Sequence, residues 1–285
     1  MTSIQVVSCV GFASLQDEGR RGVAHLAVPT GGAFDRASFS LANRILGNSP
    51  RAAAVESCRA QLVFVANTNC EIAVTGAPVS IQVAGHEQAM NEPLFVRKDD
   101  VVAIQPSQLA LRTYIAIRGG FDVEPVMGSR SFDELARLGP RPLAQGDSLP
   151  IGNDSVSDLP NSLGPVRGVS LSDSVTLRVW RGPRWDWFSN ASSITSANFV
   201  VTSKLNRVGV RLEGHSFTWD TTRRLASEGV AMGSIQVPVD GVPLIFGPDH
   251  PTTAGYPVIG IVDPRDMSTL GQVTPGTRIR FALES

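Results

Sequence analysis

The sequence carries little charge and no long apolar run. Only 18% of its 285 residues are charged, the formal net charge is -1, and basic residues never occur more than two in a row. Proteins that bind nucleic acid usually present a basic surface, so we expect no nucleic-acid partner. No apolar stretch approaches the roughly 18–20 residues of a membrane span, and the N-terminus lacks the basic start and apolar core of a signal peptide. We therefore expect no membrane partner.

Cysteine and histidine are scarce. The cysteines Cys9, Cys58 and Cys70 are odd in number, lie in apolar surroundings and form no Cys-x-x-Cys pair. This pattern predicts buried reduced thiols, which are typical of a cytoplasmic protein, with a catalytic thiol as the alternative. The four histidines have no second His or Cys at metal-ligand spacing. We therefore expect a cytoplasmic location and no metal site built by this chain alone.

Glycine and proline are frequent, with 27 and 19 residues spread along the chain. They separate short apolar runs rich in Val, Ile and Thr, which is the pattern of many short β-strands. The predicted strands are Ile4–Val10, Gln61–Val65, Cys70–Thr75, Val79–Val83, Val101–Ile104, Leu111–Ile117, Ser174–Trp180, Val208–Leu212, Gly233–Val237, Leu244–Phe246 and Ile279–Leu283. The sequence therefore predicts a mostly-β fold.

Helical patterns are few. The clearest covers Asp35–Leu46, where apolar residues recur at helical spacing, Asp35 is a suitable N-cap and Gly47 a suitable stop. A weaker pattern covers Arg184–Asn190. A mostly-β chain with one or two helices in each half is typical of barrels or sandwiches.

One polar segment divides the chain near its middle. Ile151–Pro165 is rich in Gly, Ser, Asn and Pro, as linkers are. It separates an expected N-terminal lobe of residues 1–150 from an expected C-terminal lobe of residues 166–285. Both halves end in a glycine turn that leads into a short strand, which hints at two related lobes.

Polar, glycine-rich stretches of the N-terminal half are candidates for binding anions. Residues 16–22 (QDEGRRG) gather charges around two glycines, and an exposed turn is the alternative. Residues 28–35 (VPTGGAFD) offer backbone N–H groups at a helix start, although no Gly-Lys-Ser/Thr follows as in a P-loop. Residues 118–120 (RGG) and 128–133 (GSRSFD) could bind a carboxylate or phosphate, or form loop salt bridges instead.

The C-terminal half is richer in such stretches. Residues 206–212 (NRVGVRL) alternate cations with apolar residues, so in an extended strand Arg207 and Arg211 share one face. Two arginines on one face need solvent, acids or an anionic ligand. Residues 227–238 (SEGVAMGSIQVP) and 247–257 (GPDHPTTAGYP) resemble loops that carry function on a rigid β scaffold.

Taken in order, these stretches resemble one protein family. The motifs QDEGRRG, VPTGGAFD, LANRILGN, AAAVE, VTGA, RGGFD, GSRSFD, NRVGVRL, SEGVAMGSIQVP and TTAGYP are similar to those of the allophanate hydrolase subunit 2 family, which is also known as the KipA-like family and includes the C subunit of 5-oxoprolinase. They also resemble the biotin-dependent carboxyltransferase module of urea carboxylase. The resemblance covers nearly the whole chain.

The resemblance implies two cyclophilin-like β-barrel lobes and a role as one subunit of a larger enzyme that is inactive alone. The implied partners are a KipI-like subunit 1 (the B subunit of 5-oxoprolinase) and a LamB/YcsF-type A subunit, which together open the lactam of 5-oxo-L-proline with ATP to give L-glutamate. One alternative is the carboxyltransferase half of a urea carboxylase system, with carboxybiotin supplied by another protein. Two further roles are compatible with the resemblance, namely a regulatory antagonist of a kinase inhibitor and a scaffold that only stabilises its partner.

The sequence departs from the commonest pattern of this family at two positions. Many members have Asp where this chain has Asn206, which puts proton transfer there in doubt but leaves hydrogen bonding possible. Many members have Thr where this chain has Phe132. The acid of the family pattern is kept at Asp249.

Both family reactions act on a planar amide-like group, which the protein has to position and polarise. We predict Asp249, Tyr256 and Gln236 as catalytic residues, the first two for proton handling or orientation and Gln236 for amide hydrogen bonds. Arg207 and Arg130 are predicted to contact an anion or carboxylate. The other predicted substrate- or anion-binding residues are Ser129, Asp133, Thr252, Thr253, Asp17, Arg20 and Asp35. The alternative is that all of them shape turns or a subunit interface.

Overall fold

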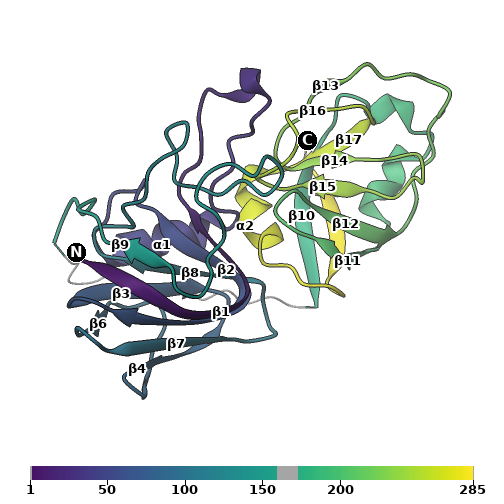
Figure 1. Cartoon of the computed structure of the whole chain (residues 1–285). Helices are drawn as coiled ribbons and strands as arrows, with labels where there is room; N and C mark the ends of the chain where they lie inside the picture. The colour runs from purple at the N-terminus through teal and green to yellow at the C-terminus, as the bar shows by residue number, and fades with distance from the viewer. Residues whose placement is uncertain (1, 159–172, 285) are drawn as a thin grey trace. The chain divides into compact units, whose positions relative to one another are not determined.

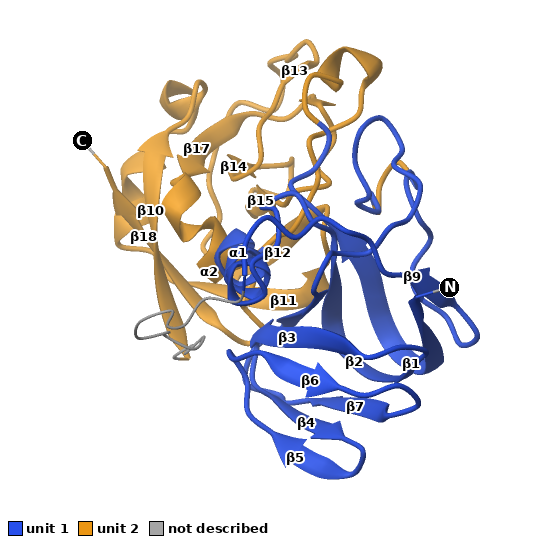
Figure 2. Cartoon of the chain, turned by 90° about the vertical axis from the view of Figure 1, so that its left-hand side faces the viewer, with its two compact units in different colours: residues 1–20, 35–133, 137–170 blue, residues 21–34, 134–136, 171–285 orange. Residues whose placement is uncertain are grey.

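The computed structural model describes residues 2–158 and 173–284. The chain divides into two compact units (Figure 2). Unit 1 comprises residues 1–20, 35–133 and 137–170, and unit 2 comprises residues 21–34, 134–136 and 171–285.

Two short segments from the first half of the sequence thus belong to the same unit as the C-terminal residues. Within the expected linker Ile151–Pro165, the structure describes only the part up to residue 158. The rest of that segment and residues 166–172 of the expected second lobe lie outside the described residues.

Unit 1 is built on one nine-stranded sheet with the strand order β5-β4-β7-β2-β8-β3-β6, in which β1 pairs with β2 and β9 (Figure 1). Two bulges in β1 shift its register against β2, between Val6 and Ser8 and between Val10 and Phe12. The elements are β1 (Ser3–Gln16), α1 (Arg36–Ile45), β2 (Ala54–Ala66), β3 (Cys70–Gly76), β4 (Val79–Val83), β5 (His86–Gln88), β6 (Leu94–Val96), β7 (Val101–Pro106), β8 (Arg112–Ile117) and β9 (Ser148–Pro150).

Strand β8 lies at the centre of this sheet, between β2 and β3, and every one of its six residues is buried. Helix α1 packs against β3 and β8. Because every residue of β8 is buried, its sequence does not show the alternation of polar and apolar residues that a half-exposed strand has. Burying each large apolar side chain of such a core contributes roughly 1.5–3 kcal/mol. The same burial brings three polar side chains of β8, Arg112, Thr113 and Tyr114, into the interior.

Unit 2 contains a closed barrel with the strand order β10-β17-β14-β15-β12-β11-β18, closed by parallel pairing of β10 with β18. A separate two-stranded sheet joins β13 and β16. The elements are η1 (Ala24–Leu26), β10 (Ser174–Arg181), η2 (Trp185–Trp187), η3 (Ala191–Thr195), β11 (Phe199–Leu205), β12 (Gly209–Gly214), β13 (Glu228–Gly229), β14 (Ser234–Gln236), β15 (Leu244–Phe246), β16 (Thr253–Ala254), β17 (Val258–Val262), η4 (Pro264–Asp266), α2 (Met267–Leu270) and β18 (Arg278–Leu283).

The predicted mostly-β fold with two barrel-like sheets is confirmed. The helix predicted at Asp35–Leu46 is α1, whereas the weaker pattern at Arg184–Asn190 contains only the short 3₁₀ helix η2. The prediction missed β17, whose apolar run is interrupted by Gly260. A Cβ at this glycine would lie 2.6 Å from Cγ1 of Val179 on β10, so the close packing of the two strands requires glycine there.

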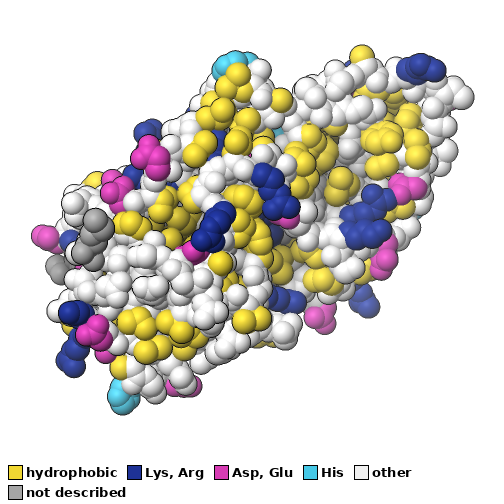
Figure 3. Space-filling model, in the orientation of Figure 1, with side chains coloured by type: hydrophobic (Ala, Val, Ile, Leu, Met, Phe, Trp, Pro, Cys, Tyr) yellow, Lys and Arg dark blue, Asp and Glu magenta, His cyan; other side chains and the backbone are white. Residues whose placement is uncertain are grey.

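Within residues 2–158 and 173–284, no helix is both long and apolar enough to cross a membrane. On the face shown in Figure 3, basic side chains are interspersed with acidic ones over the surface.

Candidate functional site

The most deeply buried charges of unit 2 are Arg207 and Asp249, with side chains 2% and 0% exposed. Arg207 lies in the bend between β11 and β12. This bend is formed because the Oδ1 atom of Asn206 accepts hydrogen bonds from the backbone N–H groups of Val208 and Gly209, at 2.9 and 3.2 Å. Such a turn stabilised by an asparagine side chain fixes the backbone on which Arg207 is carried.

The loop that carries Asp249 follows β15 and runs close beside this bend. The N–H of Gly247 donates to the carbonyl of Val208 at 2.9 Å, and the N–H of Asp249 donates to the carbonyl of Arg207 at 3.1 Å. A Cβ at Gly247 would lie only 2.3 Å from the Arg207 carbonyl oxygen. Glycine at this position is therefore what lets the two loops approach so closely.

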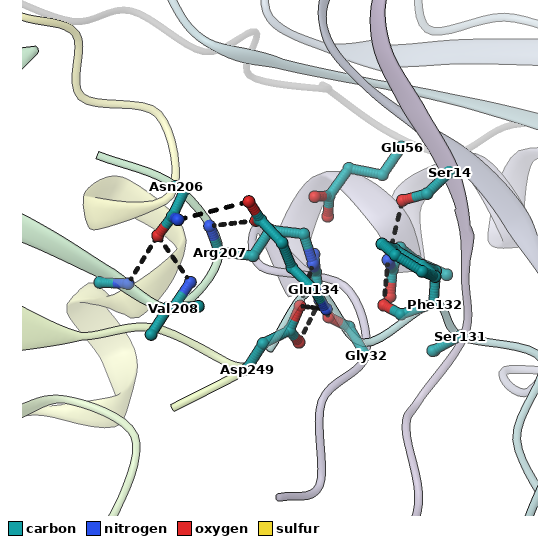
Figure 4. A network of polar contacts seen from close by, with 12 residues as sticks. Ser14, Gly32, Glu56, Ser131, Phe132, Glu134, Asn206, Arg207, Val208 and Asp249 are labelled. Carbon is teal, nitrogen blue, oxygen red and sulfur yellow. Dashed lines mark hydrogen bonds and ion pairs between the residues drawn. The ribbon is translucent and has the colours of Figure 1, made fainter. Parts of the chain in front are cut away.

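The guanidinium of Arg207 binds the carboxylate of Asp249 through two hydrogen bonds, Nε to Oδ2 at 2.7 Å and Nη2 to Oδ1 at 2.9 Å (Figure 4). Nη2 also donates to the carbonyl of Gly32 at 2.6 Å. The Asp249 carboxylate accepts a third hydrogen bond from the N–H of Glu134 at 2.9 Å. A paired, fully hydrogen-bonded ion pair is the arrangement in which buried charges are tolerated.

Glu134 completes this network, and no motif in the sequence pointed to it. Its carboxylate accepts hydrogen bonds from the N–H of Arg207 at 3.1 Å and from Nδ2 of Asn206 at 3.3 Å (Figure 4). The network thus joins residues 32, 134, 206–207 and 249, all within unit 2. It positions the start of the 247–257 loop, and the anion-binding role of Arg207 and the proton-handling role of Asp249 stay predictions.

The other residues predicted in unit 2 lie along the same 247–257 loop and beside it. Gln236, on β14, donates from Nε2 to the carbonyl of Tyr256 at 3.1 Å, while the Tyr256 side chain is 41% exposed. Thr253 is exposed on β16, which pairs with β13, and the carbonyl of Thr252 accepts the N–H of Val230 at 3.0 Å. The structure therefore brings the 227–238 and 247–257 stretches together and leaves hydroxyl groups of the loop exposed.

In unit 1, two motifs that are far apart in the sequence meet at the carboxylate of Asp17. Its Oδ1 accepts hydrogen bonds from Gly19 N–H at 2.7 Å and from the Ser129 and Ser131 hydroxyls, both at 2.6 Å. Its Oδ2 accepts the N–H of Arg130 at 2.6 Å. With four donors on one carboxylate, Asp17 holds the turn of residues 17–20 against residues 129–131.

The two predicted arginines of unit 1 take part in similar loop contacts. Arg20 is 1% exposed and donates from Nε to the carbonyl of Val126 at 3.1 Å and from Nη2 to the carbonyl of Ser131. Arg130 donates from Nε to the carbonyl of Val123 at 2.8 Å and forms an ion pair with Asp122 at 3.0 Å. The loop-salt-bridge alternative for residues 128–133 therefore has direct structural support.

The remaining predicted residues of unit 1 have structural contacts of their own. Asp35 is the N-cap of α1 and accepts the N–H of Ser38 at 3.0 Å and the Ser38 hydroxyl at 2.5 Å. Asp133 is fully buried, and its backbone pairs with Leu138. Neither contact tests the predicted binding roles.

A buried polar group in the centre of unit 1 was missed from the sequence. The hydroxyl of Tyr114 donates to Glu56 Oε2 at 2.6 Å and accepts the N–H of Asp35 at 2.8 Å, and Arg112 Nε lies 3.4 Å from Glu56 Oε1. Burial, followed by the nearby charges of Glu56 and Asp35, raises the pKa of Tyr114 well above its usual value. An arginine at the start of an apolar strand was the available signal.

No group of three or more His, Cys, Asp or Glu side chains is placed to hold a metal ion in the part of the chain that the structure describes.

The family model of the carboxyltransferase domain, subdomains A and B, matches residues 26–283 of this chain. The chain belongs to this family. The resemblance found in the sequence motifs is thereby confirmed.

Relatives of this carboxyltransferase-domain chain fall into two groups. It is 31% identical to the C subunit of 5-oxoprolinase from Escherichia coli K12, over 98% of this chain and 90% of the relative. It is 30% identical to a urea amidolyase of Lachancea kluyveri, over 98% of this chain but only 17% of the relative. The crystal structure of the Kluyveromyces lactis urea carboxylase contains a similar region, with a TM-score of 0.91 and 28% identity, and this chain spans 27% of its length.

Proposed function

We propose that this chain is the C subunit of a 5-oxoprolinase, which opens the lactam of 5-oxo-L-proline with ATP and releases L-glutamate. The observation that carries the proposal is the extent of the match to the corresponding Escherichia coli protein, which covers 98% of this chain and 90% of that one. The urea amidolyase match, by contrast, covers 17% of its relative. In this role the chain works with a KipI-like subunit and a LamB/YcsF-type subunit, in the cytoplasm.

The geometry of unit 2 supports a division of labour in that reaction. An amide is inert because of its resonance, so the enzyme has to hold it and stabilise charge on its oxygen. Thr253 and Tyr256 are exposed and have hydroxyl groups that can bind an amide, whereas Arg207 and Asp249 are buried and bonded to one another. We therefore assign substrate contact to the exposed loop residues and positioning of that loop to the buried pair.

Two of the three arginines predicted to bind a substrate or anion already have carboxylate partners, which argues against a phosphate site at these two positions. Arg207 is paired with Asp249, and Arg130 is paired with Asp122. The sequence also has no Gly-Lys-Ser/Thr phosphate loop. We propose that ATP is bound by one of the partner proteins.

The test is ATP-dependent glutamate release from 5-oxoproline by this chain purified together with its two proposed partners. We expect glutamate only when all three subunits are present, and a Tyr256→Phe complex should assemble but turn over more slowly. Glutamate release by the isolated chain would contradict the subunit role. Absence of glutamate from a correctly assembled complex would contradict the 5-oxoprolinase proposal.

A second function is favoured by the structural match to urea carboxylase at a TM-score of 0.91. In that case the chain would help transfer a carboxyl group from carboxybiotin, carried by another protein, to urea. The same purified complex, supplied with urea and a biotinylated carrier in its carboxylated form, would then discharge the carrier. Discharge that depends on urea supports this function, and discharge that does not depend on urea argues against it.

A further inference from the structure

Unit 1 has an open pocket of about 350 Å³ at one edge of its sheet, which no part of the proposed function uses. Its lining residues place it where β3 runs between β8 and the edge strand β6. These three strands are labelled in Figure 1. The polar residues that matter for its chemistry are Thr68, Asn69, Glu71, Arg118 and Asn153, and Phe95 provides an aromatic wall. A volume of this size is at the lower end of small-molecule sites.

Three of these residues form a row across neighbouring strands. Glu71 of β3 is directly opposite Phe95 of β6 in the antiparallel register. On the other side, the N–H of Arg118 donates to the carbonyl of Glu71 at 2.8 Å, one residue beyond the end of β8. Directly opposed residues place their side chains on the same face of a sheet, so Glu71 is flanked by an aromatic ring and a guanidinium.

The Arg118 guanidinium is largely occupied by backbone carbonyls. Nη1 donates to Leu46 at 3.2 Å, and Nη2 donates to Ser157 at 3.1 Å. Only Nε approaches Glu71, at 3.5 Å from Oε2, which is an ion pair without a hydrogen bond. Among the described residues, no donor forms a hydrogen bond with the Glu71 carboxylate, which is 29% exposed and lines the pocket.

The aromatic side of the pocket is equally uncovered. Phe95 is 58% exposed although it is a large apolar residue on an edge strand. The Asn69 side-chain oxygen accepts the N–H of Lys98 at 2.8 Å, which leaves its amide nitrogen as the donor. The pocket therefore combines an acceptor of full negative charge with an exposed ring and amide groups.

Two carboxylates act on the thiol that lies beside Glu71 in this pocket. The pKa of Cys70, which also lines the pocket, is raised from 9.0 to about 11 by burial and then by the charges of Glu71 and Asp100. Carboxylates that oppose a thiolate would also oppose an anionic ligand and favour a cation. This agrees with the lack of a hydrogen-bond donor on Glu71 among the residues that the structure describes.

We propose that this pocket binds a small organic ammonium ion, with the Glu71 carboxylate as its counter-ion and the Phe95 ring against its apolar part. The ammonium supplies the N–H donors that Glu71 lacks, and a cation close to an aromatic ring gains further attraction. Asn69 and Asn153 supply amide groups for any polar substituent of the ligand. The proposal does not depend on the 5-oxoprolinase assignment.

The test uses benzylammonium as the probe and benzyl alcohol as its uncharged counterpart, with calorimetry for affinity and amide chemical shifts for location. We expect benzylammonium to shift the Asn69 and Asn153 side-chain amides and to bind more tightly than benzyl alcohol. Glu71→Gln should weaken benzylammonium by about tenfold or more without changing benzyl alcohol, since it removes the charge-assisted hydrogen bonds that only the ammonium can donate. Phe95→Ala should weaken both probes.

The matched control is Glu87→Gln on β5, an exposed strand at the opposite end of the strand order. It should leave the affinity for benzylammonium unchanged. The proposal is overturned if benzyl alcohol binds as tightly as benzylammonium, if Glu71→Gln binds like the original chain, or if no binding is detected at millimolar concentrations. An unchanged thermal midpoint for Glu71→Gln shows that the variant is folded, as expected for the loss of an exposed ion pair.

Discussion

The Arg207–Asp249 pair gives the sharpest prediction for stability. In Arg207→Met, the Asp249 carboxylate loses the hydrogen bonds from Nε and Nη2 and keeps the one from the N–H of Glu134. Because both side chains are almost fully buried, the charge left behind cannot be solvated by water. Removing one partner of such a pair costs about 3–5 kcal/mol, whereas replacing both by apolar residues costs far less.

The intrinsic fluorescence of the chain reports this unit selectively. All four tryptophans, Trp180, Trp185, Trp187 and Trp219, belong to unit 2. Urea unfolding followed by tryptophan emission should therefore show a lower midpoint for Arg207→Met. The double variant Arg207→Met/Asp249→Leu should recover most of that loss.

The control is Arg211→Met on the neighbouring strand β12, which breaks the ion pair with Asp240. These two side chains are 31% and 47% exposed, so the expected cost is below about 1 kcal/mol. The reasoning is refuted if Arg207→Met costs no more than Arg211→Met, or if the double variant is destabilised by the sum of its two single changes. In the proposed three-subunit complex we also expect Arg207→Ala to lower turnover by more than about tenfold, since it releases the 247–257 loop. Normal turnover would restrict Arg207 to a role in stability.

Three further outcomes are expected. Asn206→Asp should lower the stability of unit 2 by about 1 kcal/mol in the urea assay, since it turns a hydrogen bond to Glu134 into a contact between two carboxylates; an unchanged midpoint would contradict this. Alkylation of Cys70 near pH 8, followed by mass spectrometry, should be slower by about tenfold or more in the folded chain than in the urea-unfolded chain. The pKa of about 11 lowers the fraction of Cys70 present as thiolate by about a hundredfold. The greater nucleophilicity of a thiolate of higher pKa restores only part of the rate. The pKa of Asp263 is lowered chiefly by hydrogen bonds from the side chain and backbone of Arg265. The stability that ionised Asp263 contributes is therefore present above its unfolded pKa and decreases as the pH falls below about 4. If the original chain exceeds Asp263→Asn in free energy of unfolding by the same amount at pH 3 as at pH 7, the assignment is contradicted.

Local chemistry explains what could be predicted from the sequence. Helix α1 was correctly placed because its signals, the Asp35 cap and the apolar spacing, involve residues within a few positions of one another. Strand β15 was predicted with its observed bounds, Leu244–Phe246, because the run is apolar and flanked by proline and glycine. The two-residue strands β13 and β16 carry too few side chains to show any period.

The candidate site was predictable by residue type but not by pairing. The expectation that Arg207 and Arg211 share one strand face was wrong, because β12 begins only at Gly209 and Arg207 lies in the bend before it. The need of Arg207 for solvent, an acid or an anion was predicted, and the structure supplies the acid, Asp249. Nothing local indicated that Asp17 would bind Ser129, which lies 112 residues away. Glu134 was missed because the partners of its carboxylate are the backbone N–H of Arg207 and the side chain of Asn206, which leave no mark in the sequence around it.

The discontinuous make-up of unit 2 has a consequence for the order in which the protein is made. Phe34 belongs to the hydrophobic core of this unit, and the Gly32 carbonyl accepts a hydrogen bond from Arg207, which is 175 residues further on. At roughly 5–20 residues per second, a ribosome needs about 10–35 s to synthesise that interval. During this time the segment around Phe34 has no barrel to join, so it is exposed to chaperones, proteases and other nascent chains. A fragment that starts at the central polar segment would lack these N-terminal residues altogether, and its barrel would be left with an incomplete core.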